Sequence, residues 1–511
     1  MPRLIVLLIA CAAALFGQSR ELYRPRFHYS PQRNWTNDPN GLVWFDGEYH
    51  LFYQYNPFAS IWGHMSWGHA VSRDLVHWQE LPVALAEENG VMIFTGSTVV
   101  DEQNSSGFCL AGRPCLVAVY TGHTPRAANG RPLQTQNLAF SNDRGRTWTK
   151  YSGNPVLDLH LADFRDPHVF WSAADRRWTM VVALPDQHQV LFWGSTDLKH
   201  WERFGEFGPA GATGGQWECP TLTEVPVEES NPRRTRWVLK VGLNPGAPQG
   251  GSGEQYFVGR FERGRFVNDN PPSTTLWTDY GKDCYCALTF NHLPASQAPI
   301  MLGWMNNWQY ADKLPTAPWR GQMTAPRRLQ LRQGPQGLRL VQTPAETIAS
   351  LRRNRFNWAG ASLEDLNAAL RRLSPRESTF ELDAALPLPR QGQIGWRLLG
   401  TDGTYTTVGY DARSRELWVD RTHSGKTAFS AQFPARTAAP LETGRDELQL
   451  TLLVDNSTLE VFAQQGEIAL TNLFYPPEGP LAAELFATET PAGRIVVDRW
   501  DLAPAADAAK P

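Results

Sequence analysis

Short alternations of apolar and polar residues run along most of the chain. In the segment 49–55 every second position is Tyr or Leu, and Gly, Pro, Asn and Asp separate this segment from others like it. A period of two is typical of β-strands, and the residues between them form turns. With 42 Gly and 38 Pro in the chain, the sequence predicts an almost entirely β protein with few long helices.

Two series of segments recur in the first two thirds of the chain. In 72–78, 141–148 and 195–201, a Ser-x-Asp turn is followed by Trp. In the second series a polar or acidic residue opens an apolar strand, roughly 50 to 70 residues after the previous opening, which suits a four-stranded blade with its loops. We therefore expect a five-bladed β-propeller over 22–340, with its openings converging on a central channel. The openings are Asp38, Thr95, Asp166, Glu218 and Asp283.

The pattern changes near residue 343. Thr343, Pro344 and Glu346 match the N-cap, N1 and N3 positions of a helix, so we expect a helical linker over 341–360. Ser362 followed by Leu at 363, 366, 370 and 373 predicts a second short helix. Alternation over 448–454, a turn at 455–457 and an apolar run at 459–462 predict a hairpin of a β-sandwich spanning 361–505.

The N-terminus has the features of an export signal. Arg3 supplies a positive charge, residues 4–16 are apolar, and small residues follow near Gly17. We therefore expect a signal peptide over 1–18 and a secreted or periplasmic protein. Cys11 lies in a context that resembles a lipidation site, but the apolar run continues past it, which favours a cleaved signal over a lipid anchor. No later segment is long enough to span a bilayer.

Five cysteines remain after the signal. Cys109 and Cys115 bracket a short loop containing Gly and Pro, so they are able to pair after export. Cys219 has no neighbouring cysteine in the sequence, and we interpret it as a small buried apolar residue. Cys284 and Cys286 are expected on one face of a single strand. No His pair with ligand spacing accompanies them, so we predict neither a metal site nor a cofactor.

The charge and the aromatic content of the chain favour a neutral partner. The formal net charge is −3 and no long run of either sign occurs, whereas nucleic-acid binders carry a basic patch. The chain contains 20 Trp, 24 Phe and 14 Tyr. Most of these rings must be core, but the flat faces of the remainder suit stacking on sugar rings.

Three of the five strand openings are acids, and glycoside hydrolysis needs two carboxylates, with a third free to bind sugar hydroxyls. Taken alone, the segments 37–41 and 165–167 fit an ordinary turn and an ordinary ion pair. Glu218 lies between Trp217 and Cys219 in an almost uncharged stretch. We therefore expect a partly desolvated carboxyl that keeps its proton to higher pH, as a general acid must.

Three motifs resemble those of glycoside hydrolase family 32, which contains invertases, levanases and inulinases. Residues 35–41 are similar to its nucleophile motif, with Thr36 where Met is usual. Residues 164–167 resemble its transition-state-stabiliser motif, and 218–220 its acid/base motif. The resemblance extends over nearly the whole mature chain, and the family fold is also a five-bladed propeller followed by a β-sandwich.

The resemblance implies a retaining β-fructosidase acting on fructan or sucrose. Asp38 would be the nucleophile, Glu218 the acid/base, and Asp166, held by Arg165, the group that binds fructose hydroxyls in the transition state. Retention requires the carboxyls of Asp38 and Glu218 to lie about 5 to 5.5 Å apart. The segment around Trp308 is similar to the levanase and exo-inulinase branch. The substrate-binding residues that the resemblance implies are Asn37, Gln54, Trp62, Phe94, Thr95, Arg165, Asp283 and Trp308.

Several alternatives remain open. Residues 141–148 fit the Asp-box turn of sialidases, but a sialidase would also need an Arg cluster and a Tyr nucleophile among the strand openings. An inverting five-bladed pentosidase would hold its carboxyls roughly 6.5 to 9.5 Å apart. A fructosyltransferase would share every catalytic group, and a propeller without activity would still bind fructan. The motifs also leave open β-2,1 versus β-2,6 linkage, exo versus endo action, and the oligomeric state.

Overall fold

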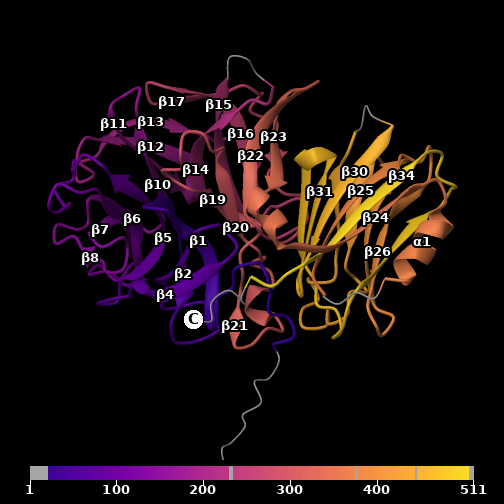
Figure 1. The fold of residues 1–511 in the computed structure, drawn as a ribbon. Coiled ribbons are helices and arrows are strands. Elements are labelled where there is room, and N and C mark those ends of the chain that lie inside the picture. The colour runs from indigo at the N-terminus through magenta and orange to yellow at the C-terminus, as the bar shows by residue number, and fades with distance from the viewer. Residues whose placement is uncertain (1–20, 230–233, 374–377, 443–445, 506–511) are drawn as a thin grey trace, which may run out of the picture.

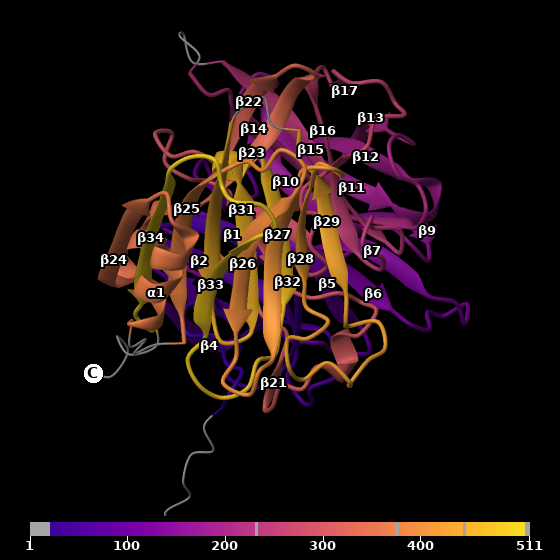
Figure 2. The same cartoon turned by 90° about the vertical axis from the view of Figure 1, so that its right-hand side faces the viewer.

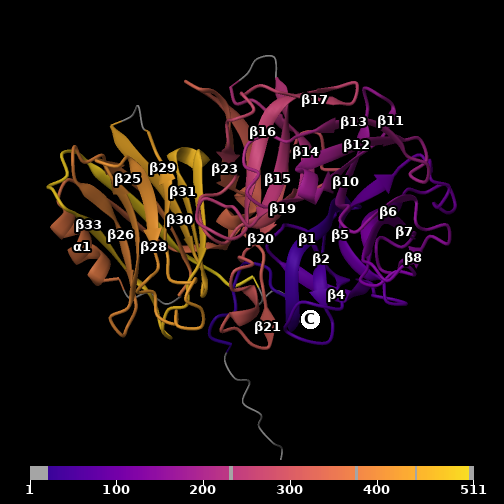
Figure 3. The same cartoon turned by 180° about the vertical axis from the view of Figure 1, so that it is seen from behind.

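The computed structural model describes residues 21–229, 234–373, 378–442 and 446–505. The predicted signal peptide over 1–18, with Cys11, lies outside these residues. Two parts lie side by side, one formed by residues up to 344 and the other by the remainder (Figures 1 and 3). Almost every element of both parts is a strand, which confirms the predicted β class. Within the described residues, no helix is long and apolar enough to cross a membrane.

The first part consists of five antiparallel sheets that follow one another along the chain. The first contains β1 (Asn34–Phe45), β2 (Glu48–Asn56), β3 (Ser66–Ser72) and β4 (Trp78–Leu85), and β21 (Trp319–Arg320) adds a parallel strand to β1. The second contains β5 (Met92–Asp101), β6 (Cys115–Thr124), β7 (Leu133–Ser141), β8 (Thr149–Lys150) and β9 (Leu157–Leu161).

The third sheet contains β10 (Arg165–Ser172), β11 (Arg177–Leu184), β12 (Gln189–Ser195) and β13 (Glu202–Phe207). The fourth contains β14 (Gln216–Pro226), β15 (Thr235–Asn244), β16 (Gly253–Glu262), β17 (Arg265–Asn268) and β18 (Leu276–Trp277). The fifth contains β19 (Tyr285–Thr289), β20 (Ile300–Trp304), β22 (Arg327–Gly334) and β23 (Gly337–Pro344). Two short 3-10 helices, η1 (Pro185–Gln187) and η2 (Ala311–Lys313), lie in the connections.

The first strand of each sheet carries the same irregularity. Near its beginning, two residues of that strand lie opposite one residue of the second strand, which is the arrangement of a β-bulge. Bulges redirect side chains, and the bulged pairs include or directly follow all the predicted acids except Asp283. The bulged pairs are residues 37–38, 94–95, 166–167, 219–220 and 286–287.

The Ser-x-Asp…Trp repeat forms one structural turn in each of the first three sheets. In the third sheet, Ser195 donates to Asp197, whose carboxylate accepts backbone N–H groups from the residues that follow. The Trp201 ring nitrogen then closes the turn by donating to the carbonyl of Leu198. The segments 72–78 and 141–148 close in the same way. The Asp-box-like segment is therefore a structural turn between a third and a fourth strand.

The second part packs two antiparallel sheets around one apolar core (Figure 2). One sheet contains β24 (Arg352–Gly360), β25 (Phe380–Pro387), β30 (Glu447–Val454), β31 (Thr458–Ala463), β32 (Ile468–Leu473) and β34 (Ile495–Leu502). The other contains β26 (Gln393–Leu399), β27 (Tyr405–Asp411), β28 (Glu416–Asp420), β29 (Arg436–Pro440) and β33 (Ala482–Ala487). The predicted hairpin is confirmed as β30 and β31, and η4 (Gln464–Gly466) follows it.

The predicted helical linker over 341–360 is wrong in extent. Only the 3-10 helix η3 (Glu346–Leu351) forms there, while β23 ends at Pro344 and β24 occupies 352–360. Pairing of β24 with β34, far away in sequence, outweighs the local helix signal. The second predicted helix is confirmed as α1 (Leu363–Arg371). Ser362 caps it by accepting the N–H of Asp365, and its apolar face packs on the core.

A buried charged network joins the two parts. Arg327, from the fifth sheet, forms ion pairs with Asp279 and with Glu460 of β31. His28, near the N-terminus, lies 2.9 Å from Asp455 and 2.8 Å from Glu460, measured from its two ring nitrogens. Although burial opposes a charge on His28, the hydrogen bonds to Asp455 and Glu460 raise its pKa to about 9. The network therefore fixes the second part against the first through paired charges.

Candidate active site

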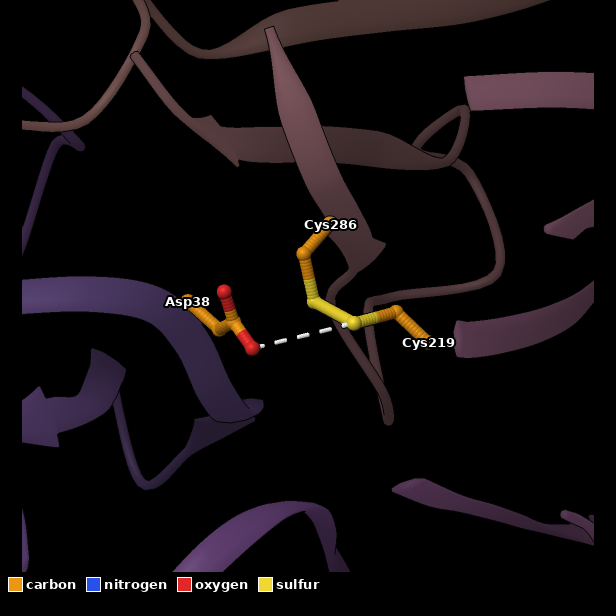
Figure 4. A group of neighbouring side chains, drawn as sticks. All are labelled: Asp38, Cys219 and Cys286. Atoms are coloured by element: carbon orange, nitrogen blue, oxygen red, sulfur yellow. Dashed lines mark hydrogen bonds between the residues drawn. A yellow bond between two sulfur atoms is a disulfide. The ribbon is translucent and has the colours of Figure 1, made fainter. Parts of the chain in front are cut away.

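Asp38, Asp166 and Glu218, which we call the carboxylate cluster, meet around one residue although they come from three different sheets. The backbone N–H of Cys219, the neighbour of Glu218, donates to Oδ2 of Asp166 over 2.9 Å. The Sγ atom of Cys219 lies 3.8 Å from Oδ2 of Asp38 (Figure 4). The sequence predicted this convergence from the strand openings, and the structure brings the three acids together.

Asp38 lies in the bulge of β1 and is buried. Its Oδ2 accepts a hydrogen bond of 2.7 Å from the hydroxyl of Thr95, in the bulge of β5. Its Oδ1 has no hydrogen-bond partner among the described residues. Burial raises the pKa of Asp38 to about 6, the Thr95 hydrogen bond opposes that rise, and the charge of Glu218 adds to it. Oδ2 of this carboxylate is thus held by Thr95, while Oδ1 is buried without a hydrogen-bond partner among the described residues.

Asp166 lies in the bulge of β10 with a φ of 67°, a backbone conformation that non-glycine residues rarely adopt. Its N–H donates to the hydroxyl of Thr121 over 2.9 Å, which holds the bulge from the neighbouring sheet. Burial raises the pKa of Asp166 to about 7, although the nearby charge of Arg165 opposes the rise. The bulge turns this carboxylate toward Cys219 and away from the hydrogen bonds that pair β10 with β11.

Glu218 is held from two sides. Arg165 contacts Oε1 through Nη2 at 2.9 Å and through Nε at 3.2 Å, and the Tyr285 hydroxyl donates to Oε2. The side chain of Glu218 is 20% exposed. Asp163 and Gln216 fix the same guanidinium at 2.5 Å and 2.9 Å.

Two expectations about this acid and its neighbours need correction. The sequence predicted an apolar setting for Glu218, but an arginine from another sheet lies against its carboxylate. Arg165 was expected to hold Asp166, yet its hydrogen bonds go to Glu218, Asp163, Gln216 and Gln134. Adjacent residues of a strand point to opposite sides, and the bulge separates residues 165 and 166 further.

Three carboxylates and one guanidinium leave the cluster with an excess of negative charge. The charge of Glu218 raises the pKa of both Asp38 and Asp166, and Asp38 raises that of Asp166 as well. Neighbouring carboxylates in a buried setting do not all ionise together, so near pH 6 to 7 the cluster retains a proton. A cluster of this kind holds ionised and protonated carboxylates at the same time, and the raised pKa values fall on Asp38 and Asp166.

Aromatic residues lie on or against the segments that carry Asp38 and Thr95. Trp62 is 44% exposed and its ring meets Phe94 edge-on at 6.0 Å. Phe94 directly precedes Thr95, and its ring stacks on His123 at 4.5 Å. Trp308 is partly buried and stacks on Trp35 at 5.9 Å. An exposed Trp packed on the residue that precedes Thr95 suits a site that stacks on a sugar ring.

The buried amides Asn37 and Gln54 stand at the first bulge. The Oδ1 of Asn37 accepts from the Trp35 ring nitrogen over 2.8 Å, so it orients that ring beneath Trp308. Gln54 lies opposite the bulge and donates to the carbonyl of Ile93, immediately before Phe94. Both predicted residues therefore hold the segments that carry Asp38 and Thr95.

The prediction that Asp283 lines the sugar site is wrong. Its side chain has no exposed surface, and it pairs with the equally buried Arg421 of the second part. The Tyr310 hydroxyl donates to Oδ1 of Asp283 over 2.5 Å, and the N–H of Leu473 donates to Oδ2 over 2.8 Å. With both oxygens committed to the interface between the two parts, Asp283 has a structural role.

Tyr285 takes the place that the sequence assigned to Asp283. Glu218 and Tyr285 are each the last residue to pair before the bulge of their strand. They therefore occupy equivalent positions in the fourth and fifth sheets. Counting from the bulge instead of from the first polar residue would have identified Tyr285, but the sequence alone does not mark where the bulge lies.

Two disulfides are present among the described residues. Cys109–Cys115 closes the short loop before β6, as its spacing allowed. Cys219 pairs with Cys286, 67 residues away, so its interpretation as an unpaired buried residue is wrong. Cys284 is the free, buried cysteine of the same region.

Asp38, Cys219 and Cys286 offer three potential metal-ligand atoms within 4.8 Å of one another. Metal ligation by cysteine requires a thiolate. Because the two sulfurs are bonded to each other (Figure 4), this group is a carboxylate beside a disulfide and not a metal site.

Comparison with known proteins matches both parts of the chain to one family. The model of the glycosyl hydrolases family 32 N-terminal domain matches residues 28–344, and that of the family 32 C-terminal domain matches residues 347–500. A levanase from Bacillus subtilis (strain 168) is 41% identical over 494 residues, covering 95% of this chain and 71% of that protein. An extracellular exo-inulinase from Aspergillus awamori is 38% identical over 514 residues, covering 94% and 95%.

Solved structures agree with these matches. The crystal structure of exo-inulinase from Aspergillus awamori superimposes with a TM-score of 0.86 at 36% identity, covering 94% of this chain and 99% of that one. The β-fructofuranosidase from Schwanniomyces occidentalis, solved with fructosyl-erythritol, gives a TM-score of 0.83 at 32% identity, covering 94% and 98%.

Proposed function

Since the chain belongs to glycosyl hydrolase family 32, we propose that it is a secreted, retaining β-fructosidase that releases fructose from levan, inulin or sucrose. Relatives named levanase, exo-inulinase and β-fructofuranosidase support this substrate class. Two relatives have names that describe them as extracellular, which supports the export that the N-terminal sequence predicts. The single observation that carries the proposal is the meeting of Asp38, Asp166 and Glu218 around Cys219.

In the first step, Asp38 attacks the anomeric carbon of the terminal fructose. Oδ1 is the attacking atom, because Oδ2 is held by Thr95. Glu218 donates its proton to the glycosidic oxygen as the bond to the leaving sugar breaks. The step forms a covalent fructosyl ester on Asp38 and releases the shortened chain, or glucose when the substrate is sucrose.

In the second step, Glu218 removes a proton from water, and the resulting nucleophile displaces the ester and releases fructose with retained configuration. Asp166 accepts hydrogen bonds from fructose hydroxyls while positive charge develops at the anomeric carbon. Arg165, which lies against Glu218, stabilises the charge that proton donation leaves on that carboxylate.

Exposed Trp62 and neighbouring Phe94 supply the stacking surface for the sugar, and Trp308, which packs on the buried Trp35, supplies another. Aromatic faces and buried carboxylates together suit a neutral, hydroxyl-rich substrate. The reaction as written needs no metal and no cofactor, because proton transfer and nucleophilic attack are both carried out by carboxylates.

We further propose that the five sheets are the blades of a five-bladed β-propeller over 22–340 and that residues 361–505 form a β-sandwich domain. Five consecutive sheets, each with a bulge near the start of its first strand, and hydrogen bonds between the first strands of different sheets support a ring around a common axis. The packing of the two later sheets around one core supports the sandwich.

Activity of Asp38→Ala on inulin, levan and sucrose tests the function. We expect the wild-type protein to release fructose from at least one of these three substrates. Asp38→Ala should show no turnover but should still bind the substrate. Asp402→Ala, the same change at an exposed turn, serves as the control and should match wild type. Full activity of Asp38→Ala would remove Asp38 as nucleophile, and oligosaccharides longer than the substrate would point to a fructosyltransferase.

A further inference from the structure

We propose that the Cys219–Cys286 disulfide is a positioning link that sets the geometry of the carboxylate cluster for hydrolysis. This inference rests on the proposed roles of Asp38, Asp166 and Glu218. Cys219 lies in β14 of the fourth sheet and Cys286 in β19 of the fifth. No backbone ladder joins these two strands in the described chain. Side-chain links must therefore fix their separation.

Two such links lie next to each other. Glu218 and Cys219 are consecutive on β14, and Tyr285 and Cys286 are consecutive on β19. The Tyr285 hydroxyl donates to Glu218, and one residue further along each strand the sulfurs are bonded. The covalent bond thus fixes the register in which Tyr285 reaches the acid/base carboxylate.

Both cysteines occupy an unusual backbone conformation at the bulge of their strand. The φ of Cys219 is 48° and that of Cys286 is 46°, in the left-handed region that non-glycine residues rarely adopt. Such a conformation persists only where its surroundings impose it. A covalent bond between the two bulged residues, which are 1% and 0% exposed, restrains both strands at the point where they depart from regular pairing.

The bulge of β14 contacts all three acids. The sulfur of Cys219 lies against Asp38 (Figure 4). Its N–H holds Asp166, and Glu218 directly precedes it in the chain. A misplacement of about 1 Å in a catalytic group typically lowers turnover by on the order of 100-fold. Opening the disulfide is therefore expected to lower kcat by about 10- to 100-fold and to leave KM within about 3-fold, since stacking residues such as Trp62 belong to other segments.

The disulfide also keeps an ionisable thiol away from the nucleophile. A free cysteine in water titrates near pH 8.5, and burial beside a carboxylate would raise the pKa of a Cys219 thiol above that value. Bonded sulfurs carry no charge. In Cys286→Ala, the remaining thiol of Cys219 would stand beside Asp38, and its ionisation would add a negative charge there. We expect an additional loss of activity on the alkaline side in Cys286→Ala that is absent in Cys219→Ala/Cys286→Ala.

The other disulfide provides a matched control. Cys109–Cys115 closes a loop of the second sheet, six residues apart in sequence, and neither cysteine takes part in the carboxylate cluster. The variant Cys109→Ala/Cys115→Ala loses one disulfide of similar burial and should keep the wild-type kcat and pH profile. A general cost of losing a disulfide would appear in this variant as reduced thermal stability alone.

The experiment begins with peptide mapping of the exported protein without reduction, which should recover the Cys219 and Cys286 peptides joined. Steady-state sucrose hydrolysis across pH then compares Cys286→Ala, Cys219→Ala/Cys286→Ala and the control. Joined peptides together with a lower kcat in both Cys286 variants support the proposal. Free thiols in the exported protein, or wild-type kcat and pH limits in both folded Cys286 variants, overturn it.

If the Cys286 variants fail to fold, the control variant is reduced in its folded state with a phosphine. The S–S bond takes two electrons and two protons to give two thiols, and the phosphine gains oxygen from water to become its oxide. Lost kcat should follow the fraction of protein reduced and return on reoxidation. Unchanged kcat in fully reduced protein contradicts the proposal. Glu218→Gln in the same assay tests the proposed function separately, because its retained activity would remove Glu218 as acid/base whatever the disulfide does.

Discussion

Thr95→Val removes one hydroxyl from the site with little change of shape. The Thr95 hydroxyl donates to Oδ2 of Asp38 over 2.7 Å and is one of the contacts that hold down the pKa of that carboxyl, which burial raises to about 6. A hydrogen bond to a charged acceptor is worth about 1.5 to 3 kcal/mol, and 1.36 kcal/mol corresponds to one pKa unit. Its loss should therefore raise the pKa of Asp38 from about 6 to between about 7 and about 8.

The ionised fraction of Asp38 at pH 6 then falls from about one half to between roughly one tenth and one hundredth. Because only the ionised carboxylate attacks, kcat/KM at pH 6 should fall by about 5- to 50-fold, with partial recovery as the pH rises. The sign follows from the chemistry: a raised pKa keeps the nucleophile protonated to higher pH, so activity is lost on the acidic side.

The assay is the initial rate of sucrose hydrolysis at low substrate concentration across the pH range. Thr95→Ser retains a hydroxyl at the same position and should keep the wild-type acidic limb. An acidic limb that does not move in Thr95→Val would refute the reasoning. So would a loss of equal size at every pH, because it would mean that Thr95 only positions the backbone.

Three further predictions follow from buried contacts. Tyr285→Phe should lower kcat about 10-fold with little change in KM, measured on sucrose, since it removes a hydrogen bond to the acid/base; an unchanged kcat contradicts that role. Arg421→Met should lower the free energy of unfolding in urea by about 3 to 5 kcal/mol, because Asp283 keeps an unpaired buried charge, whereas Arg415→Met at an exposed pair should not. His28, with a pKa of about 9 against an unfolded value of 6.5, stabilises the fold fully below pH 6.5. About 3 kcal/mol of the free energy of unfolding should be lost as the pH rises from 6.5 through 9. A melting temperature that does not change up to pH 10 would contradict this role of His28.

The sequence correctly predicted the strands, turns and helix that depend on interactions between residues close together in the chain. Alternation and turn residues identified the strands, and Ser362 with its following leucines identified α1, because capping and amphipathic spacing act within one helix. The three acids were found because each precedes a strongly apolar strand at a similar place in its sheet. Their convergence follows once the first strands of the sheets are brought together.

Local sequence patterns did not predict the contacts between different sheets. The bond between Cys219 and Cys286 depends on the distance between two strands that share no ladder. Asp283 was mistaken for a sugar ligand because its partner, Arg421, lies 138 residues away in the other part. The predicted helix after Thr343 competes with the pairing of β24 and β34, which no local pattern reveals.

Covalent trapping on Asp38 tests the central claim most directly. Glu218→Gln is mixed with a fructosyl fluoride, whose leaving group needs no proton, so the ester forms while its hydrolysis lacks a base. Mass spectrometry of peptides should then find one fructosyl residue attached to the peptide that contains Asp38. An unmodified protein that still hydrolyses the fluoride, or a label on any other residue, would contradict the double-displacement mechanism.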